Sequence, residues 1–332
     1  MKLLLAFLLV NLFLINDPFA QTIYVAPNGS DQNPGTAEQP LATLTAAIDR
    51  IRLLRKQNPS AQHAWQVIIR RGEYIMPETL NLSVDDSGTE TSPLLFKGEE
   101  GAMPVFYGGF FLNKFERISD SLWKTDVPQV RRYGWRFEQL YVNGSRAIRA
   151  QSPNVGFYKP VSVKETVIVN GDGRAPELAV QQIKIPAEAA NRIKNLNEED
   201  LKDAVITFYH HWDNTKKPVQ FYNAADTSIY ISGEGMKPWN PVTTASLFAI
   251  ENVSSALDAP GEWFLESSGT LYYYPKPGET IETTTAMAPA LDKFITLSGN
   301  AATGEKIKNI RFENISFRVA GYRMPAGGVE PA

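Results

Sequence analysis

The sequence contains no cysteine and only three histidines, His63, His210 and His211, among its 332 residues. The absence of cysteine excludes disulfide frameworks, thiolate zinc sites and cysteine nucleophiles. Three histidines are too few for a histidine-rich metal centre. The formal net charge of -3 provides no basic stripe of the kind that binds nucleic acid. We therefore expect no metal, no cofactor and no nucleic-acid partner.

The remaining composition is that of a globular protein with a sizeable core. Hydrophobic residues make up 43% and charged residues 21% of the chain, which excludes a disordered protein. A chain of 332 residues is long enough for one large domain or two ordinary ones. The 23 glycines and 22 prolines, with 13 tyrosines and 17 phenylalanines, favour turns and strands and predict an all-β fold.

Residues 1–20 have the pattern of a secretory signal peptide. Lys2 precedes an apolar run over residues 3–15, and Ala20 is the small residue expected before a cleavage site. The run is short for a membrane span, although an N-terminal membrane anchor is the alternative. Because no later segment is long and apolar enough to cross a membrane, and because cysteine is absent, we expect a bacterial protein that is secreted, periplasmic or on the cell surface.

Residues 21–112 indicate short strands and one helix. The spacing of Leu44, Ala47, Ile48 and Ile51 predicts a helix over residues 40–55, with Thr43 or Thr45 as its N-cap. Short strands are predicted at residues 23–25, 67–69, 79–82, 94–96 and 105–107. Turns rather than helices separate the later strands, which excludes a βαβ sheet.

Residues 113–290 read as an inserted, mostly-β module with longer strands. The predicted strands are residues 137–142, 205–212, 228–232, 246–252 and a hairpin of 262–265 with 270–274. Short helices are predicted at residues 186–193 and after Asn197.

Residues 291–332 return to short strands. Ile310 and Phe312 alternate with polar residues, a bend follows at residues 313–314, and Ile315 and Phe317 alternate again. Two alternating pairs joined by a bend containing asparagine are typical of one coil of a parallel β-helix, and an antiparallel meander is the alternative. Because each coil must stack on its neighbours, we expect the parallel β-helix to be incomplete at the end of this sequence and the native chain to continue past Ala332.

Motifs along nearly the whole mature chain resemble those of secreted right-handed parallel β-helix proteins that act on carbohydrates. They include YVAPNGSD at 24–31, QPLATL at 39–44, RGEY at 71–74, QLYVNG at 139–144, RAIRA at 146–150, PGEW at 260–263 and GTLYY at 269–273. The combination is similar to glycoside hydrolase family 141, which includes α-L-fucosidase and xylanase activities. The resemblance implies that the catalytic carboxylates lie on later coils, so no catalytic residue is assigned here.

The most chemically dense segment is Tyr-His-His-Trp-Asp at residues 209–213. On the predicted strand, His210 and Trp212 share one face, and Asp213 lies on the other. Trp212 is a candidate platform for a sugar ring, and His210 and Asp213 are candidates for hydrogen bonds to sugar hydroxyls or for proton transfer. The alternative is that one face fills the core of the module and the other is solvated.

Three further charged residues are candidates for substrate binding. Arg146 and Arg149 flank the end of a predicted strand, where they are suited to bind a uronate carboxylate through paired hydrogen bonds. The alternative is that they are solvated or paired internally. Glu262 is a candidate carboxylate that opens a hairpin, where a structural role is the alternative. Asp86 and Glu251 are further carboxylates, and Asp86 is most simply explained as the cap of a turn.

The sequence therefore supports three hypotheses. The first is the N-terminal part of a secreted glycoside hydrolase acting on plant or algal polysaccharide. The second is a polysaccharide lyase on a similar β-helix, and the third is a non-catalytic carbohydrate-binding or adhesion protein. All three have a polysaccharide or oligosaccharide partner, and we expect a monomer when the protein is full length.

Overall fold

The computed structural model describes residues 20–58 and 64–329. The predicted signal peptide lies outside these residues except for Ala20, which begins the first strand. The chain folds into two compact units: unit 1 comprises Met1–Tyr107 and Lys293–Arg318, and unit 2 comprises Gly108–Asp292 and Val319–Ala332. Residues 291–332 were predicted to resume the β-helix. In the structure, the chain runs in unit 1 from Lys293 to Arg318 and returns to unit 2 at Val319. In the two described ranges, no helix combines the length and apolarity that crossing a membrane requires.

Unit 1 contains the predicted helix, α1 (Leu44–Gln57). The Thr43 hydroxyl accepts a hydrogen bond from the Ala46 N–H, so Thr43 rather than Thr45 is the N-cap. Leu44, Ala47, Ile48 and Ile51 are buried on one face of the helix, as their spacing predicts.

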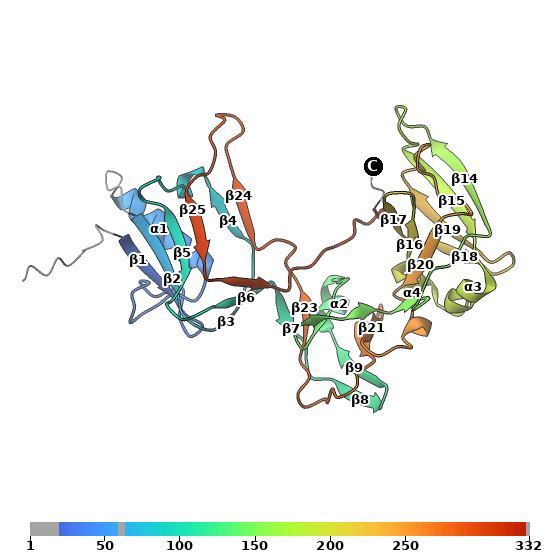
Figure 1. The fold of residues 1–332 in the computed structure, drawn as a ribbon, viewed down its shortest axis with the longest axis horizontal. Helices are drawn as coiled ribbons and strands as arrows, with labels where there is room; N and C mark the ends of the chain where they lie inside the picture. The colour runs from blue at the N-terminus through green and yellow to red at the C-terminus, as the bar shows by residue number, and fades with distance from the viewer. Residues whose placement is uncertain (1–19, 59–63, 330–332) are drawn as a thin grey trace, which may run out of the picture. The chain divides into compact units, whose positions relative to one another are not determined.

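The strands of unit 1 pair in parallel in three small sheets (Figure 1). The largest contains β1 (Ala20–Val25), β2 (Ala64–Ile69), β5 (Leu94–Gly98) and β25 (Ile310–Glu313); another contains β3 (Glu73–Ile75), β6 (Val105–Tyr107) and β26 (Ser316–Arg318); the last contains β4 (Leu80–Ser83) and β24 (Ile295–Ser298). Because β25 and β26 pair in parallel with β5 and β6, the antiparallel meander considered for this segment is wrong.

Side chains stack from strand to strand inside unit 1. Phe312 lies 4.7 Å from Phe96 between ring centroids, and Phe317 lies 5.6 Å from Phe106. Phe312 and Phe317 also meet each other at 6.4 Å, so both point to one interior, as their alternation predicts. Asn314 turns the chain between them with a φ of 54°, a left-handed conformation that asparagine tolerates.

Unit 2 is also built mainly of strands, most of them antiparallel, in four sheets. One contains β7 (Gly109–Phe111), β10 (Tyr141–Val142), β11 (Ser145–Arg146) and β23 (Ala286–Pro289); another contains β8 (Glu116–Ser119), β9 (Leu122–Asp126), β12 (Ile148–Arg149), β21 (Glu262–Leu265) and β22 (Thr270–Tyr273). The third contains β13 (Gln151–Ser152), β16 (Val205–Tyr209), β17 (Asn214–Pro218) and β20 (Leu247–Glu251), and the fourth contains β14 (Ser162–Val169), β15 (Leu178–Lys184), β18 (Phe221–Asn223) and β19 (Ser228–Gly233).

Short helices cover part of unit 2. They are α2 (Pro128–Tyr133), α3 (Ala187–Ile193) and α4 (Glu198–Asp203), with single 3-10 turns at Val84–Asp86 in unit 1 and Ser254–Ala256 in unit 2. Pro186 precedes α3, and the Asn197 side chain caps α4 by accepting from the Asp200 N–H at 2.8 Å, so both helices begin where the sequence predicts.

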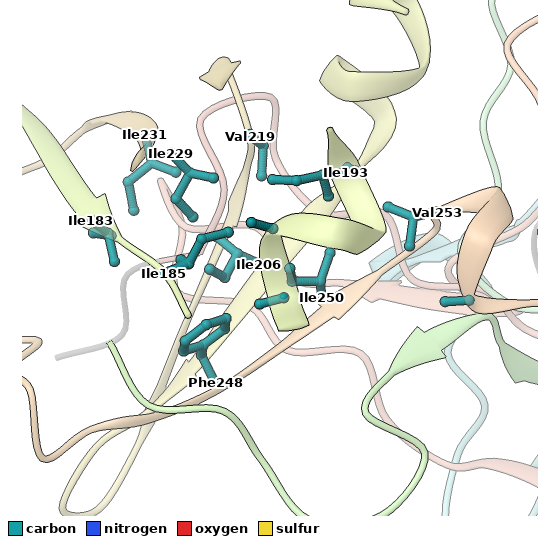
Figure 2. Close-up of a cluster of buried hydrophobic side chains, with 14 of the residues drawn as sticks. Ile183, Ile185, Ile193, Ile206, Val219, Ile229, Ile231, Phe248, Ile250 and Val253 are labelled. Carbon is teal, nitrogen blue, oxygen red and sulfur yellow. The ribbon is translucent and has the colours of Figure 1, made fainter. Parts of the chain in front are cut away.

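Two hydrophobic clusters hold unit 2 together. The first packs isoleucines of β15, β16, β19 and β20 against α3 and includes Phe248 (Figure 2). The second gathers aromatic side chains, among them Phe137, Trp123, Trp263 and Tyr273. Trp263 stacks on Phe137 with a centroid distance of 5.3 Å.

Several strands differ from their predicted bounds. The strand predicted at residues 137–142 is reduced to β10, because Phe137 and Leu140 are buried without strand pairing. The strand predicted at residues 205–212 ends at Tyr209, and a tight turn follows in which the His210 N–H donates to the Asp213 carbonyl. The three-residue strands β3 and β7 were not predicted, and remote strands supply their partners.

Candidate functional site

Unit 2 contains a pocket of about 650 Å³ that combines both arginines singled out in the sequence with two carboxylates. We call it the Arg149 pocket. Strands β10 to β13 supply its floor, β17 and β20 supply one wall, and residues 320–322 supply another. The lining side chains used below are those of Glu138, Gln139, Tyr141, Arg146, Arg149, Lys216, Glu251 and Tyr322.

Arg149 is held rigidly at the floor of the pocket. Its strand β12 pairs in parallel with β21, which places Arg149 opposite Trp263. The guanidinium lies 5.9 Å from the centroid of the Trp263 ring, a cation–π contact with a fully buried aromatic residue. Trp263 in turn stacks on Phe137, so the aromatic core of unit 2 determines where the arginine lies.

The guanidinium of Arg149 has donors that no protein acceptor uses. Its Nε and Nη1 atoms are buried, and among the described residues neither has a hydrogen-bond partner. Burial lowers the pKa of Arg149, and the nearby Glu251, Glu138 and Asp203 carboxylates oppose that shift. An arginine nevertheless stays protonated in proteins, so a positive charge with free donors lies at the pocket.

The two carboxylates of the pocket share one lysine. The Lys216 ammonium lies 2.9 Å from Oε2 of Glu251 and 4.0 Å from Oε2 of Glu138. The Thr207 hydroxyl donates to Oε1 of Glu251 at 2.9 Å, and the Met324 N–H donates to Oε1 of Glu138 at 2.5 Å. Both carboxylates are therefore ordered by three different segments of the chain.

The lysine limits the separation of the two carboxylates. Because one ammonium lies within 4.0 Å of both, the Oε2 atoms are at most about 7 Å apart, which excludes the upper part of the roughly 5 to 9.5 Å range of glycosidase carboxylate pairs. The same lysine sits where a substrate atom would have to lie, so the pair serves as a polar wall of a binding site in this arrangement.

Residues 320–324 close one side of the pocket through backbone hydrogen bonds. The Tyr322 N–H donates to Oε1 of Gln139 at 2.6 Å, and the Tyr141 hydroxyl donates to the Ala320 carbonyl at 3.3 Å. The Tyr322 side chain is exposed, and a smaller pocket of about 210 Å³ shares Gln139 and Tyr322 with the first. An aromatic ring at the rim and amide groups below it suit the faces and hydroxyls of a sugar.

Arg146 joins Arg149 in the lining, as the sequence-based pairing of the two arginines proposed. It lies on β11, opposite Tyr141 of β10, and is exposed. The pocket lining thus contains three cationic side chains and two anionic ones. Lys216 is shared by the two carboxylates, so the three cationic and two anionic side chains of the lining leave a net charge of +1.

The segment with His210, Trp212 and Asp213 lies elsewhere in unit 2, in the turn between β16 and β17. We call residues 210–213 the hairpin tip. Trp212 is 63% exposed, which leaves its ring free for a ligand. The Asp213 carboxylate accepts from the Asn240 amide, and Nε2 of His210 lies 2.8 Å from the Thr215 hydroxyl. Burial lowers the pKa of His210, opposed by Asp213. None of the three residues lines the Arg149 pocket.

Glu262 is buried and organises the chain around it. Its Oε2 accepts from the N–H groups of Asp258 and Ala259 at 3.0 and 2.9 Å. Burial raises the pKa of Glu262 despite these bonds. The side chain closes the loop before β21, which is the structural alternative considered for it, and it does not line the pocket.

Sequence reasoning missed Glu138, Lys216 and Tyr322. Each lies in a segment without a motif, and only the fold brings them to Arg149. Glu138 directly precedes the QLYVNG motif at 139–144, which together with RAIRA at 146–150 pointed to this part of the chain. Across residues 20–58 and 64–329, no group of three or more histidines and carboxylates is arranged to hold a metal ion.

Comparisons with known proteins place this geometry in a family context. Residues 120–276, which contain most of the pocket, match the GH141 insertion domain. A solved structure named "Glycoside hydrolase" superposes on 94% of this chain with a TM-score of 0.76 and 26% sequence identity. The chain is GH141-like.

Two curated proteins share sequence with parts of this GH141-like chain. "Uncharacterized protein YwoF" of Bacillus subtilis (strain 168) is 35% identical over 108 residues, and "Pectate lyase PEL9" of Emericella nidulans is 26% identical over 150 residues. These matches cover 32% and 44% of this chain. The chain spans 53% of the solved glycoside hydrolase and only 19% and 33% of the two curated relatives.

Proposed function

We propose that this is a secreted carbohydrate-active protein whose Arg149 pocket binds a glycan. The pocket carries the proposal, because it combines a fixed guanidinium with free donors, two ordered carboxylates and an exposed tyrosine at the rim. Sugars require such convergent polar groups beside an aromatic face. The match of residues 120–276 to the GH141 insertion domain and the solved glycoside hydrolase support a carbohydrate ligand.

We further propose that unit 1 forms coils of a right-handed parallel β-helix, and that the chain is the N-terminal part of a longer glycoside hydrolase. The parallel sheets, with aromatic side chains stacked from strand to strand, support the coils. On this proposal the activity is α-L-fucosidase-like or xylanase-like, and the acidic and basic catalytic groups lie on later coils.

Binding of glycans to this chain tests the proposal. The chain is titrated calorimetrically with plant and algal oligosaccharides, including fucosylated and xylan-derived ones. We expect Arg146→Ala to weaken binding about tenfold, since an exposed arginine donates charge-assisted hydrogen bonds to a ligand. Trp212→Ala, at the hairpin tip, is the matched variant outside the pocket and should not change affinity. Failure of every oligosaccharide to bind, or loss of binding in Trp212→Ala alone, contradicts the proposal.

A polysaccharide lyase is the second candidate, and the pectate lyase relative favours it. Lyases cleave uronate polymers by elimination and leave an unsaturated product that absorbs in the ultraviolet. The product of the native gene is incubated with uronate polymers and with neutral polysaccharides. Release of reducing sugar without ultraviolet absorbance supports the hydrolase, whereas ultraviolet absorbance supports the lyase. Binding without turnover supports the non-catalytic alternative.

A further inference from the structure

The unused donors of Arg149 indicate what kind of sugar the pocket takes. A buried guanidinium without an acceptor is costly, because its N–H groups have lost water without gaining a partner. Nε and Nη1 of Arg149 are in that state among the residues described. The Nε–H group and the adjacent Nη2 group form one edge of the planar guanidinium, and two parallel donors on an edge match the two oxygens of a carboxylate.

The carboxylates around Arg149 already have other partners. Glu251 is bound to Lys216 and Thr207, and Glu138 to Lys216 and the Met324 N–H. The third carboxylate near the guanidinium, that of Asp203, lies 3.3 Å from Nε of Arg136. Arg149 forms no ion pair with any of these three described residues, so the donors at its Nε and Nη1 atoms remain for a ligand.

The position of Arg149 is determined before a ligand arrives. Its strand is paired with β21, and its guanidinium rests over the ring of Trp263, which belongs to the buried aromatic cluster. A donor group fixed in this way loses little freedom on binding, and preorganised sites bind more tightly for that reason.

We propose that the Arg149 pocket is specific for an acidic sugar, with the uronate carboxylate accepting paired hydrogen bonds from the Nε edge of Arg149. This inference rests on the proposed glycan-binding function and names its substrate class. Arg146, the exposed cation that leaves the charged side chains of the lining with a net charge of +1, adds long-range attraction to the same anion. The carboxylates of Glu138 and Glu251 in the walls favour a singly charged carboxylate over a doubly charged phosphate.

Matched acidic and neutral ligands test the inference. The chain is titrated with trigalacturonate and with its methyl ester, and with a xylo-oligosaccharide that carries a glucuronate and one that lacks it. We expect at least one acidic member to bind at least about tenfold more tightly than its neutral counterpart, which corresponds to about 1.4 kcal/mol. Equal affinity within both pairs overturns the inference but leaves the proposed function standing. No binding of any neutral or acidic glycan overturns the proposed function itself.

Variants test the role assigned to Arg149. Arg149→Lys keeps the positive charge but loses the two parallel N–H donors of the guanidinium edge, so it should remove most of the preference for the acidic ligand. Arg131→Lys is the matched control, because Arg131 makes a similar fork with Asp126 on an exposed surface outside the pocket. An acidic preference that survives Arg149→Lys overturns the assignment.

A measurement on the unmodified chain covers the case in which Arg149→Lys does not fold. Arginine Nε–H resonances are followed by NMR as the acidic ligand is added. The same titration is then carried out with the neutral ligand. One Nε–H signal should shift downfield with the acidic ligand alone. An unchanged set of arginine signals on saturation with the acidic ligand overturns the inference.

Discussion

At the scale of single residues, two groups of charged side chains in this protein are stabilised by partners from distant segments. Asp86 is 1% exposed and receives two hydrogen bonds from Arg52, at 2.9 and 2.7 Å. Lys216 connects Glu138 and Glu251 in the same manner. Removing one member of such a group leaves the others without compensation, which costs more than the interaction itself contributes.

We predict that Lys216→Met destabilises unit 2 by about 2 kcal/mol, because it leaves two poorly solvated carboxylates facing each other. The free energy of unfolding is measured by urea denaturation. Lys124→Met is the control: its ion pair with Glu116 is exposed, and such pairs contribute at most about 1 kcal/mol. Equal effects of the two substitutions would show that the pocket carboxylates do not depend on the lysine.

Asp86 predicts a dependence of stability on pH. Burial by itself raises the pKa of Asp86, but hydrogen bonds from Arg52 and from Ser83 outweigh it, and the net pKa is lowered. A lowered folded-state pKa adds stability that is complete above the unfolded value of about 3.9 and is lost as the pH falls through the folded value.

The expected result is that Asp86→Asn lowers the free energy of unfolding by about 2 kcal/mol at pH 7. The difference from the unmodified protein should shrink as the pH falls below about 4. Asp85→Asn, at the neighbouring residue, should have little effect at either pH. A difference that stays constant from pH 7 to pH 3 argues against the charge of Asp86 as the cause.

At the scale of elements, local signals were reliable where a hydrogen bond within a few residues defines an end. The first turn of α1 illustrates this, since the Thr43 hydroxyl accepts from the Ala46 N–H at 3.1 Å. Strands were less predictable at their ends, because a strand ends where its partner ends. Tyr209 is the last residue of β16 because Asn214 is its partner across the turn.

Thr43→Ala should therefore destabilise unit 1 by about 1 kcal/mol, the usual cost of losing an N-cap. Thr45→Ala, two residues later in the first turn, removes a hydroxyl of the same kind that caps nothing, and should change stability by less than about 0.5 kcal/mol. Both are measured by thermal and urea unfolding. A larger loss of stability in Thr45→Ala than in Thr43→Ala would show that Thr43 is not the N-cap of α1.

At the scale of the whole molecule, the chain forms two units that are each discontinuous in sequence. Unit 1 is interrupted after Tyr107 and resumed at Lys293, so unit 2 is inserted between β6 and β24, which belong to two different parallel sheets of unit 1. Each unit has its own buried aromatic residues, with Phe96 in unit 1 and Phe248 in unit 2 both 0% exposed. Separate cores predict separate unfolding transitions.

Calorimetry of the full chain should resolve two transitions. Phe248→Ala should lower the temperature of only one transition and Phe96→Ala that of only the other. Each substitution should reduce the free energy of unfolding of its own unit by about 3 to 5 kcal/mol. A single transition that both substitutions lower equally would show that the two units unfold as one cooperative structure.

The amino-acid pattern was sufficient for features that depend on neighbours in sequence. The all-β composition, a threonine cap at Thr43 or Thr45, the starts of α3 and α4, and the inward positions of Phe312 and Phe317 are all local in this sense. It also singled out Arg146 and Arg149 as a pair. Periodicity and capping act over a few residues, which is why the amino-acid order alone reveals them.

The pocket depends on contacts that no pattern encodes. Three lining residues lie far from Arg149 in sequence: Lys216, Glu251 and Tyr322. They and the nearer Glu138 meet Arg149 only because several sheets pack around one aromatic cluster. Whether an arginine is paired or free is likewise a matter of three-dimensional neighbours. The sequence established the building elements because their energetics are local. Only the tertiary structure brought the residues of the Arg149 pocket together and left the hairpin tip outside it, because burial and charge compensation are long-range.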